Sequence, residues 1–231
     1  MVRSLSNRLT ACCGYVRPGD RVADVGCDHG LLGIYLLENG IARSVIASDV
    51  REGPLHQAVI NGEKYGVSHK MSFYLCDGVR GIPRDFDCMV CAGMGGDTMI
   101  SILEAAPWLK SSRYRLILQC QSKRPMLREY LNRQGYAITR ETLAKDGKFL
   151  YPVMEVTYHP GTLLTPGMYY LSPALLESGS PLLPEYRQRV MDGLRRSIRG
   201  LEKNGGEKYH RFCRILEELE GGTDHDNSRP D

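Results

Sequence analysis

The chain has 231 residues and a formal net charge of +3, and 42% of its residues are hydrophobic. This length suffices for one substantial domain plus an appendage, and the composition is that of an ordinary soluble globular protein. No run of eighteen apolar residues occurs, which argues against a membrane span. Residues 1–8 lack the apolar core of a signal peptide, so we expect a cytoplasmic protein.

A short helix is predicted over residues 3–15, followed by a turn at Pro18-Gly19-Asp20. Apolar runs then alternate with helical patterns, which is typical of a parallel sheet covered on both faces. The predicted strands are Arg21–Val25, Ser44–Ser48, Lys70–Leu75, Phe86–Cys91 and Arg115–Gln121. The predicted helices are His29–Asn39, Gly53–Tyr65, Asp97–Ala106 and Arg124–Gln134.

The end of this alternating region differs from its beginning. Two β-rich runs, Tyr136–Leu143 and Phe149–Tyr158, are joined by residues 145–148, which contain Asp-Gly. This dipeptide between two such runs is a strong hairpin signal. A parallel sheet closed by an antiparallel hairpin predicts the α/β fold of class I Rossmann-like methyltransferases, with seven strands. A nicotinamide-binding domain would usually continue with another βαβ unit.

Beyond residue 160 several prolines break the chain into short pieces. Two amphipathic helical patterns follow, over residues 184–203 and 207–220, and predict an antiparallel, coiled-coil-like helical hairpin. We therefore expect a methyltransferase domain over residues 1–160, a C-terminal helical hairpin over 161–220 and a disordered tail over 221–231. Between Glu185 and Arg214 there are nine basic and four acidic residues, a local positive excess that favours an anionic partner.

Most of the eight cysteines lie in apolar, strand-like runs, where cysteine behaves as a small hydrophobic residue. Cys88 and Cys91 match the spacing of a zinc or redox pair, but no second pair of cysteines or histidines follows. We interpret both as buried strand residues and expect no metal site.

The most informative stretch is Val22–His29, a predicted buried strand that stops at Gly26 with one acid before the turn and a second after it. Doubly wound domains present backbone and carboxylates to a nucleoside cofactor in this way. Asp24 is placed to accept hydrogen bonds from a cofactor amino group. The short spacing and the second acid, Asp28, favour S-adenosylmethionine over a dinucleotide.

Acids also follow the next two predicted strands. Asp49, about twenty residues after the glycine turn, is placed to accept hydrogen bonds from ribose hydroxyls. Asp77 and Gly78 end the third strand, where an acid in methyltransferases accepts from the adenine amino group. Each acid taken alone is also explained as a turn or capping residue.

The fourth predicted strand leads into a glycine-rich loop, Ala92-Gly93-Met94-Gly95-Gly96. Glycines there bring the main chain close to both the cofactor and the substrate, and the following helix offers free amide donors. The Lys-Ser/Thr ending of a phosphate-binding P-loop is absent, so that alternative is disfavoured.

Five segments together resemble the bacterial TrmK family of tRNA (adenine-22-N1)-methyltransferases. They are Leu5–Leu9, Asp24–His29, Asp49–Pro54, Cys76–Gly78 and Gly93–Gly96. The resemblance covers residues 1–160 and extends to the two-helix C-terminal part. It implies S-adenosylmethionine as cofactor and the N1 atom of adenosine 22 in tRNA as methyl acceptor. Cys27 and Gly30-Leu31 depart from the family pattern, which has Ser and Ala-Tyr there.

The predicted cofactor-binding residues are Asp24, Gly26, Cys27, Asp28, Asp49, Val50, Asp77, Gly78, Gly93, Met94 and Gly95. Asp28 is the predicted catalytic residue. It lies where it could bond the target adenine or offset the positive charge that develops on it, although a residue there could also cap the following helix. The target base lies inside folded RNA and is expected to turn out of its stack.

For tRNA binding we expect contacts from Arg3, Arg8, Arg187, Arg195, Arg199 and Lys203, because phosphate contacts supply most RNA affinity. We expect a monomer. Two alternatives remain: a methyltransferase acting on another RNA, a protein or a small molecule, and a non-catalytic module that binds tRNA or cofactor. A solvated helix face would also explain the basic residues.

Overall fold

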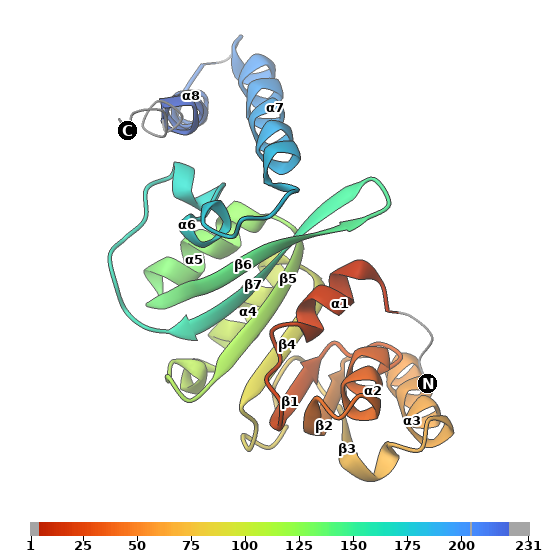
Figure 1. Ribbon diagram of the computed structural model, residues 1–231. Helices are drawn as coiled ribbons and strands as arrows, with labels where there is room; N and C mark the ends of the chain where they lie inside the picture. Colours follow the sequence, from red (N-terminus) through yellow and green to blue (C-terminus); the bar gives the residue numbers. More distant parts are fainter. Residues whose placement is uncertain (1–4, 204, 222–231) are drawn as a thin grey trace, which may run out of the picture.

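The computed structural model describes residues 5–203 and 205–221, and its centre is one seven-stranded sheet in the order β3-β2-β1-β4-β5-β7-β6 (Figure 1). Neighbouring strands from β3 to β5 run parallel, whereas β7 is antiparallel to both β5 and β6. The predicted parallel sheet with a terminal antiparallel hairpin is therefore confirmed. The strands are β1 (Asp20–Val25), β2 (Ala42–Asp49), β3 (Met71–Leu75), β4 (Cys88–Gly95), β5 (Arg115–Ser122), β6 (Tyr136–Asp146) and β7 (Phe149–Tyr158).

The helices follow the predicted order with small changes at their ends. In the first two thirds of the chain they are α1 (Asn7–Cys13), α2 (Leu31–Glu38), α3 (Glu52–Lys64), α4 (Gly96–Glu104) and α5 (Arg124–Arg133). Short 3-10 turns are η1 (Ser68–Lys70), η2 (Pro107–Leu109) and η3 (Gly167–Tyr169). The first helix is shorter than the predicted span 3–15, and residues 1–4 lie outside the described residues.

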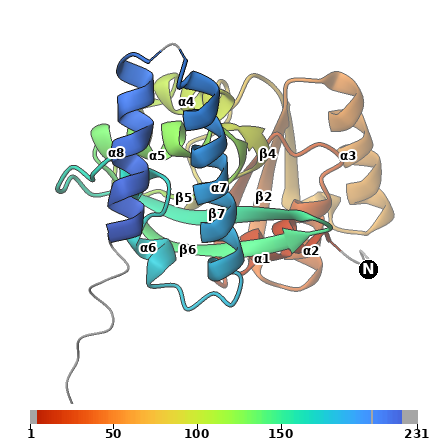
Figure 2. The same cartoon turned by 90° about the horizontal axis from the view of Figure 1, so that it is seen from above.

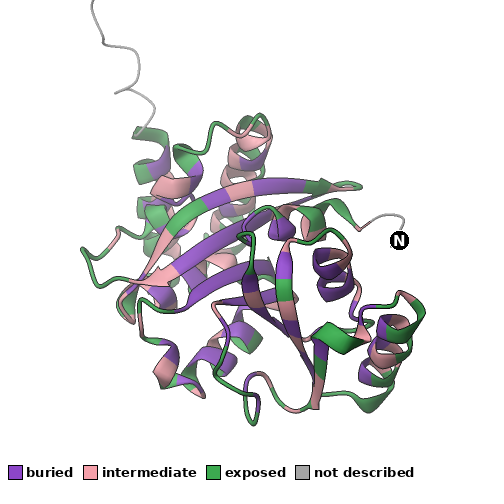
Figure 3. Ribbon diagram, turned by 60° about the horizontal axis from the view of Figure 1, so that its bottom comes forward, coloured by how far each residue is buried: buried purple, intermediate pink, exposed green. Residues whose placement is uncertain are grey.

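Helices cover both faces of the sheet, and side-chain alternation along each strand divides the interior into two apolar layers. Val22 and Val90 face the layer that contains α1, α2 and α3, whereas Ala23 and Met89 face the layer that contains α4 and α5. Successive residues of a strand point to opposite faces, so a strand buried on both sides must be apolar throughout. Figure 3 shows the result as buried strands enclosed by more exposed outer surfaces.

The β6–β7 hairpin is longer than predicted because β6 continues to Asp146, leaving Gly147 and Lys148 as a two-residue turn. The hairpin extends past β5 towards α1 (Figure 1). The Asn7 amide donates to Asp146 Oδ1 at 3.0 Å, which ties the start of α1 to this turn.

The C-terminal part contains α6 (Pro173–Leu176), α7 (Leu183–Leu201) and α8 (Glu207–Gly221), with α7 and α8 side by side (Figure 2). The predicted pair of helices is confirmed. Gly221 ends α8 rather than beginning the tail, and residues 222–231 lie outside the described residues. Leu194 of α7 and Ile215 of α8 share a third apolar cluster with Leu143 and Leu150 of the hairpin. The predicted division at residue 160 therefore crosses a shared hydrophobic core.

The structure also bears on the cysteine pair and on membrane-spanning helices. Cys88 and Cys91 lie buried in β4, as predicted, and burial raises the pKa of both thiols to about 12. Among the helices that the structure describes, none is long and apolar enough to cross a membrane.

A buried ion pair links the sheet to the C-terminal part. Arg128 of α5 pairs with Glu141 of β6, and both side chains are fully buried. Arg128 Nη1 also donates to the Tyr169 carbonyl at 3.1 Å, and Ser172 Oγ donates to Glu141. Burial of a charged pair costs desolvation energy, which its mutual attraction and these additional hydrogen bonds offset. This cluster therefore holds α5, the hairpin and residues 169–172 in one arrangement.

We predict that Arg128→Met lowers the free energy of unfolding by about 3–5 kcal/mol, because it leaves the Glu141 carboxylate buried without its partner. The double variant Arg128→Met/Glu141→Met should recover much of this loss, since no uncompensated charge remains. Urea unfolding monitored by circular dichroism measures both.

Arg133→Met on the same helix is the matched control, because its ion pair with Glu129 is exposed and should contribute under about 1 kcal/mol. Equal destabilisation by Arg128→Met and Arg133→Met would contradict the role given to the buried pair.

Candidate cofactor pocket

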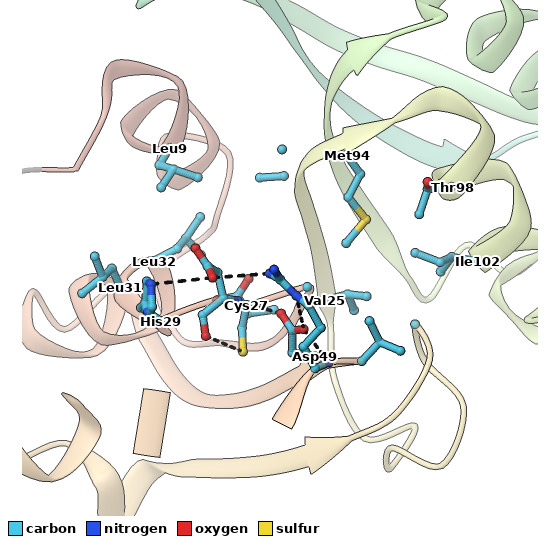
Figure 4. Close-up of a pocket in the computed structure, with 18 of the residues that line it drawn as sticks. Leu9, Val25, Cys27, His29, Leu31, Leu32, Asp49, Met94, Thr98 and Ile102 are labelled. Carbon is cyan, nitrogen blue, oxygen red and sulfur yellow. Dashed lines mark hydrogen bonds and ion pairs between the residues drawn. The ribbon is translucent and has the colours of Figure 1, made fainter. Parts of the chain in front are cut away.

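A cavity of about 350 Å³ opens at the carboxyl ends of β1, β2, β3 and β4. The sheet order reverses between β1 and β4, and ligands of open α/β sheets bind at such a switch point. Figure 4 shows Met94, Thr98 and Ile102 on one side of the cavity and Leu31 and Leu32 on the other. A volume of this size is that of a small-molecule site.

Gly26 has no side chain, so the main chain of the turn after β1 is accessible to a ligand in the pocket. Its φ of +69° lies in the left-handed region, and an added Cβ would lie 2.1 Å from Cε of Met94. Glycine alone adopts this conformation without strain. The Met94 side chain thus packs directly against the turn that follows β1.

Asp24 is a buried carboxylate with unused hydrogen-bonding capacity. It is 4% exposed, and the Gly33 amide in the first turn of α2 donates to it. Its Oδ2 atom has no hydrogen-bond partner among the described residues. Burial, followed by the smaller effect of the nearby Asp49 charge, raises the pKa of Asp24 to about 7. A cationic group bound in the pocket would both fill the free acceptor and favour its ionised form.

Asp49 at the end of β2 holds two neighbouring loops. Its Oδ2 accepts from the Asp28 amide at 3.0 Å and its Oδ1 accepts from the Arg51 amide at 2.9 Å. Each carboxylate oxygen can accept a second hydrogen bond, so Asp49 can also accept hydrogen bonds from a ligand in the pocket that it lines. Its predicted bond to a ribose hydroxyl stays a prediction.

Asp28 lies at the mouth of the pocket with 59% of its side chain exposed. Its φ of +52° is left-handed, a conformation that Asp and Asn tolerate better than other non-glycine residues. Oδ1 lies 3.6 Å from Arg51 Nη2 and 3.8 Å from His29 Nε2. Helix α2 begins at Leu31 without any side-chain cap, so Asp28 does not cap it.

The predicted glycine-rich loop is in fact the end of β4. Residues 93–95 continue the strand beside β5, with irregular register between Ala92 and Gly95. Gly93 has a φ of +84°, and its amide donates to the Gln119 side chain at 3.0 Å. The prediction of a loop was wrong because a β-bulge can absorb glycines without ending a strand.

Gln119 is a residue that the sequence reasoning missed. It is fully buried in β5, and its Oε1 accepts from both the Gly93 amide and Arg8 Nη1, the latter at 3.1 Å. Arg8 of α1 also lies 3.8 Å from Asp146 of the hairpin turn and lines the pocket. A glutamine within the apolar run of β5 was the available signal.

The structure brings most of the predicted cofactor residues together. Ten of the eleven line the pocket, namely Asp24, Gly26, Cys27, Asp28, Asp49, Val50, Asp77, Gly78, Gly93 and Met94. Gly95 does not line it. An added Cβ on Gly95 would lie 2.9 Å from Asp97 Oδ1 and 3.0 Å from Ser122 Oγ, so this glycine serves the close packing between β4, β5 and α4.

Three of these ten residues, Cys27, Val50 and Asp77, differ in their surroundings. Cys27 is buried, and burial raises the pKa of its thiol. Val50 is 67% exposed, a large apolar surface that a bound ring could cover. Asp77 lies 3.3 Å from Arg80 in an exposed ion pair. Arg51 and Thr98 also line the pocket without having been predicted.

The predicted RNA-binding residues fall into separate groups. Arg187 donates to the Leu219 carbonyl, and Arg195 pairs with Glu220, so both hold α7 against α8. Arg199, in the last turn of α7, and Lys203, in the turn that follows the helix, are both exposed. Arg3 lies outside the described residues, and no group of three or more metal-binding side chains occurs in the described part of the chain.

Comparison with known proteins matches residues 5–154 to a family model described as a methyltransferase domain. The tRNA (adenine(22)-N(1))-methyltransferase of Bacillus subtilis is 36% identical over 146 residues, which are 62% of this chain and 61% of that protein. The match thus spans about three fifths of this curated relative.

Solved structures extend the likeness over nearly the whole chain. A Streptococcus pneumoniae protein described as a candidate tRNA (m1A22) methyltransferase has a TM-score of 0.84 at 27% identity, covering 94% of this chain and 99% of that one. Its complex with S-adenosyl-L-methionine has a TM-score of 0.77 at 26% identity, with the same coverage. The B. subtilis TrmK structure, at 24% identity and a TM-score of 0.78, covers 96% of both chains and supports the shared fold.

The raised pKa of Asp24 predicts a pH-dependent stability. The folded protein retains the Asp24 proton up to pH about 7, whereas the unfolded chain loses it near the ordinary value of 3.8. This group therefore lowers stability as the pH rises from about 4 to 7. We therefore compare the free energy of unfolding of ligand-free Asp24→Asn with that of wild type. We predict that this difference favours the variant by about 1–3 kcal/mol more at pH 8 than at pH 4.

Urea unfolding at both pH values measures the difference. Glu52→Gln, which removes an exposed acid of α3, is the control for net charge. An Asp24→Asn effect that is the same at pH 4 and pH 8 would refute a buried carboxylate that ionises near neutrality.

Proposed function

The chain belongs to the methyltransferase domain family, and on that basis we propose that it transfers a methyl group from S-adenosylmethionine to N1 of adenosine 22 in tRNA. One observation carries the proposal: every residue that lines the pocket lies between positions 8 and 102, inside the matched region 5–154. The name of the B. subtilis relative supports the substrate, and the S. pneumoniae complex supports the cofactor.

The residues present fit this cofactor. The unpartnered Oδ2 of buried Asp24 suits the cationic amino group of its methionine part, and Gly26 allows the main chain to approach it closely. We assign Asp49 to the ribose hydroxyls and Asp77 to the adenine amino group, which their position in the pocket lining supports. When bound, the cofactor supplies an activated methyl group on a sulfonium.

The acceptor atom needs alignment more than it needs a base. N1 of adenine carries a lone pair that can attack the methyl carbon, so the N–C bond forms as the S–C bond breaks and the base becomes cationic. We assign Asp28 to this step because its exposed carboxylate stands at the pocket mouth. It would accept from the adenine amino group and stabilise the developing charge. Gln119 would position the Gly93 main chain and Arg8 beside the same opening.

We further propose that exposed Arg199 and Lys203 contact the tRNA backbone, since such contacts supply sequence-independent affinity. A tRNA-modifying role is consistent with action in the cytoplasm.

We predict that the purified protein transfers labelled methyl groups from S-adenosylmethionine to unmodified tRNA, giving N1-methyladenosine on nucleoside analysis. The same tRNA with guanosine at position 22 is the matched control and should accept no label. Label in both tRNAs would show that the methyl acceptor is not adenosine 22. Label in neither tRNA would contradict the proposed function.

We predict that Asp28→Asn slows single-turnover methyl transfer at least about tenfold while the dissociation constant for S-adenosylmethionine changes less than about threefold. Asparagine suits this position because it tolerates the left-handed backbone and removes only the charge. Rapid-quench kinetics and calorimetry measure the two quantities.

Glu52→Gln on exposed α3 is the control, since it removes a nearby charge that does not line the pocket. Equal losses of cofactor affinity and transfer rate in Asp28→Asn would assign Asp28 to cofactor binding instead of catalysis.

A further inference from the structure

A second cavity, of about 430 Å³, lies where the carboxyl end of β5 meets the hairpin turn and the C-terminal helices. We call it the β5–α7 groove. The lining residues on which the argument rests are Lys123, Arg124, Phe149, Tyr170, Arg189 and Phe212. They come from β5–α5, the hairpin, the segment after η3, α7 and α8, so the groove exists only because the C-terminal part packs on the hairpin.

Basic side chains line the groove, and most of them already have acidic partners. Its lining includes four basic side chains, those of Lys123, Arg124, Arg128 and Arg189, and no acidic one. Three of these side chains are paired with carboxylates: Lys123 with Asp97, Arg128 with buried Glu141, and Arg189 with Glu185. Arg124 donates to the carbonyls of Cys120 and Gln121 and has no carboxylate partner among the described residues. Its guanidinium is therefore free to bind an anion such as a phosphate.

An exposed aromatic ring stands at the edge of the groove. Phe149, at the start of β7, is 52% exposed although it is large and apolar. Lys148 Nζ lies 5.5 Å from its ring centroid, and the Tyr151 ring centroid lies 6.0 Å away. Aromatic rings beside cationic side chains are the combination on which unstacked nucleic-acid bases settle.

The groove adjoins the cofactor pocket through the end of β5. Gln121 and Ser122 line the groove. A Cβ added to Gly93 would lie 3.7 Å from Gln121 Nε2, and one added to Gly95 would lie 3.0 Å from Ser122 Oγ. Gly93 of the cofactor pocket therefore lies next to Gln121 of the groove. Lys123, with a left-handed φ of +55°, turns the chain from β5 into α5 at this border.

We propose that the β5–α7 groove holds a second, unstacked nucleotide of the RNA substrate, with its base on Phe149 and its phosphate on Arg124. This rests on the proposed function, because the nucleotide would be a neighbour of the base presented to the cofactor pocket. The groove has the volume of a small-ligand site rather than the breadth of a protein interface, and the guanidinium of Arg124 complements phosphate.

Steady-state kinetics of Phe149→Ala and Arg124→Ala test the proposal. Each variant should raise KM for tRNA about tenfold, as expected for loss of one stacked base or one phosphate contact, while kcat stays within about twofold. S-adenosylmethionine affinity should be unchanged. Ile60→Ala and Arg43→Ala are matched controls, because they are exposed residues of α3 and β2 that lie outside the groove.

A spectroscopic measurement reports on the stacking itself. The chain has one tryptophan, Trp108, which packs against Phe86 and Tyr114 away from the groove lining. In Phe149→Trp, added tRNA should quench fluorescence beyond any change seen in wild type, because a base would stack on the new indole. An acidic polyanion without bases, heparin, should leave this added signal unquenched.

The outcomes separate the two proposals. Wild-type protein that fails to methylate tRNA overturns the proposed function, and tRNA binding by fluorescence anisotropy then tests the groove alone. Unchanged tRNA KM and binding in Phe149→Ala and Arg124→Ala, or equal quenching by tRNA and heparin in Phe149→Trp, would overturn the groove proposal even if wild type is fully active.

Discussion

Burial of the parallel strands on both faces is the constraint on which the rest of the structure depends. Strands β1, β2 and β4 have apolar layers on either side, so polar groups are confined to the strand ends. Asp24 and Asp49 lie at the carboxyl ends of adjacent strands, which brings their charges together beside one cavity. The resulting burial raises the pKa of Asp24, and the main-chain amides around Asp49 keep its loops in place. Ionised Asp24 is destabilised by its burial, and a bound cationic group would reduce this destabilisation.

The hairpin and the C-terminal helices depend on a different contact. The buried pair between Arg128 and Glu141 fixes α5 against β6, and Ser172 donates a further hydrogen bond to Glu141. The third apolar cluster then packs α7 and α8 on the hairpin. This arrangement makes the groove next to the cofactor pocket, and Arg128, which holds the C-terminal part in place, also lines that groove.

Much of the fold was predictable because periodicity and strand-end chemistry are local. The alternation of apolar runs and helical patterns predicted the five parallel strands, and Asp-Gly predicted the hairpin. Ten predicted cofactor residues meet in one pocket, since parallel strands bring their carboxyl ends to the same edge. Glycines 93–95 misled the prediction, because a bulged strand and a loop contain the same residues.

By itself, the sequence determined the order of the elements, the strand ends that carry acids and the family to which they point. Only the tertiary structure decided which polar groups are left unpaired and which charges are already used. Gln119 supports Gly93 across two strands, Arg195 is held by Glu220 on another helix, and Arg124 is left without a carboxylate partner in the described residues. These differences arise from contacts between residues far apart in the chain, which no local pattern encodes.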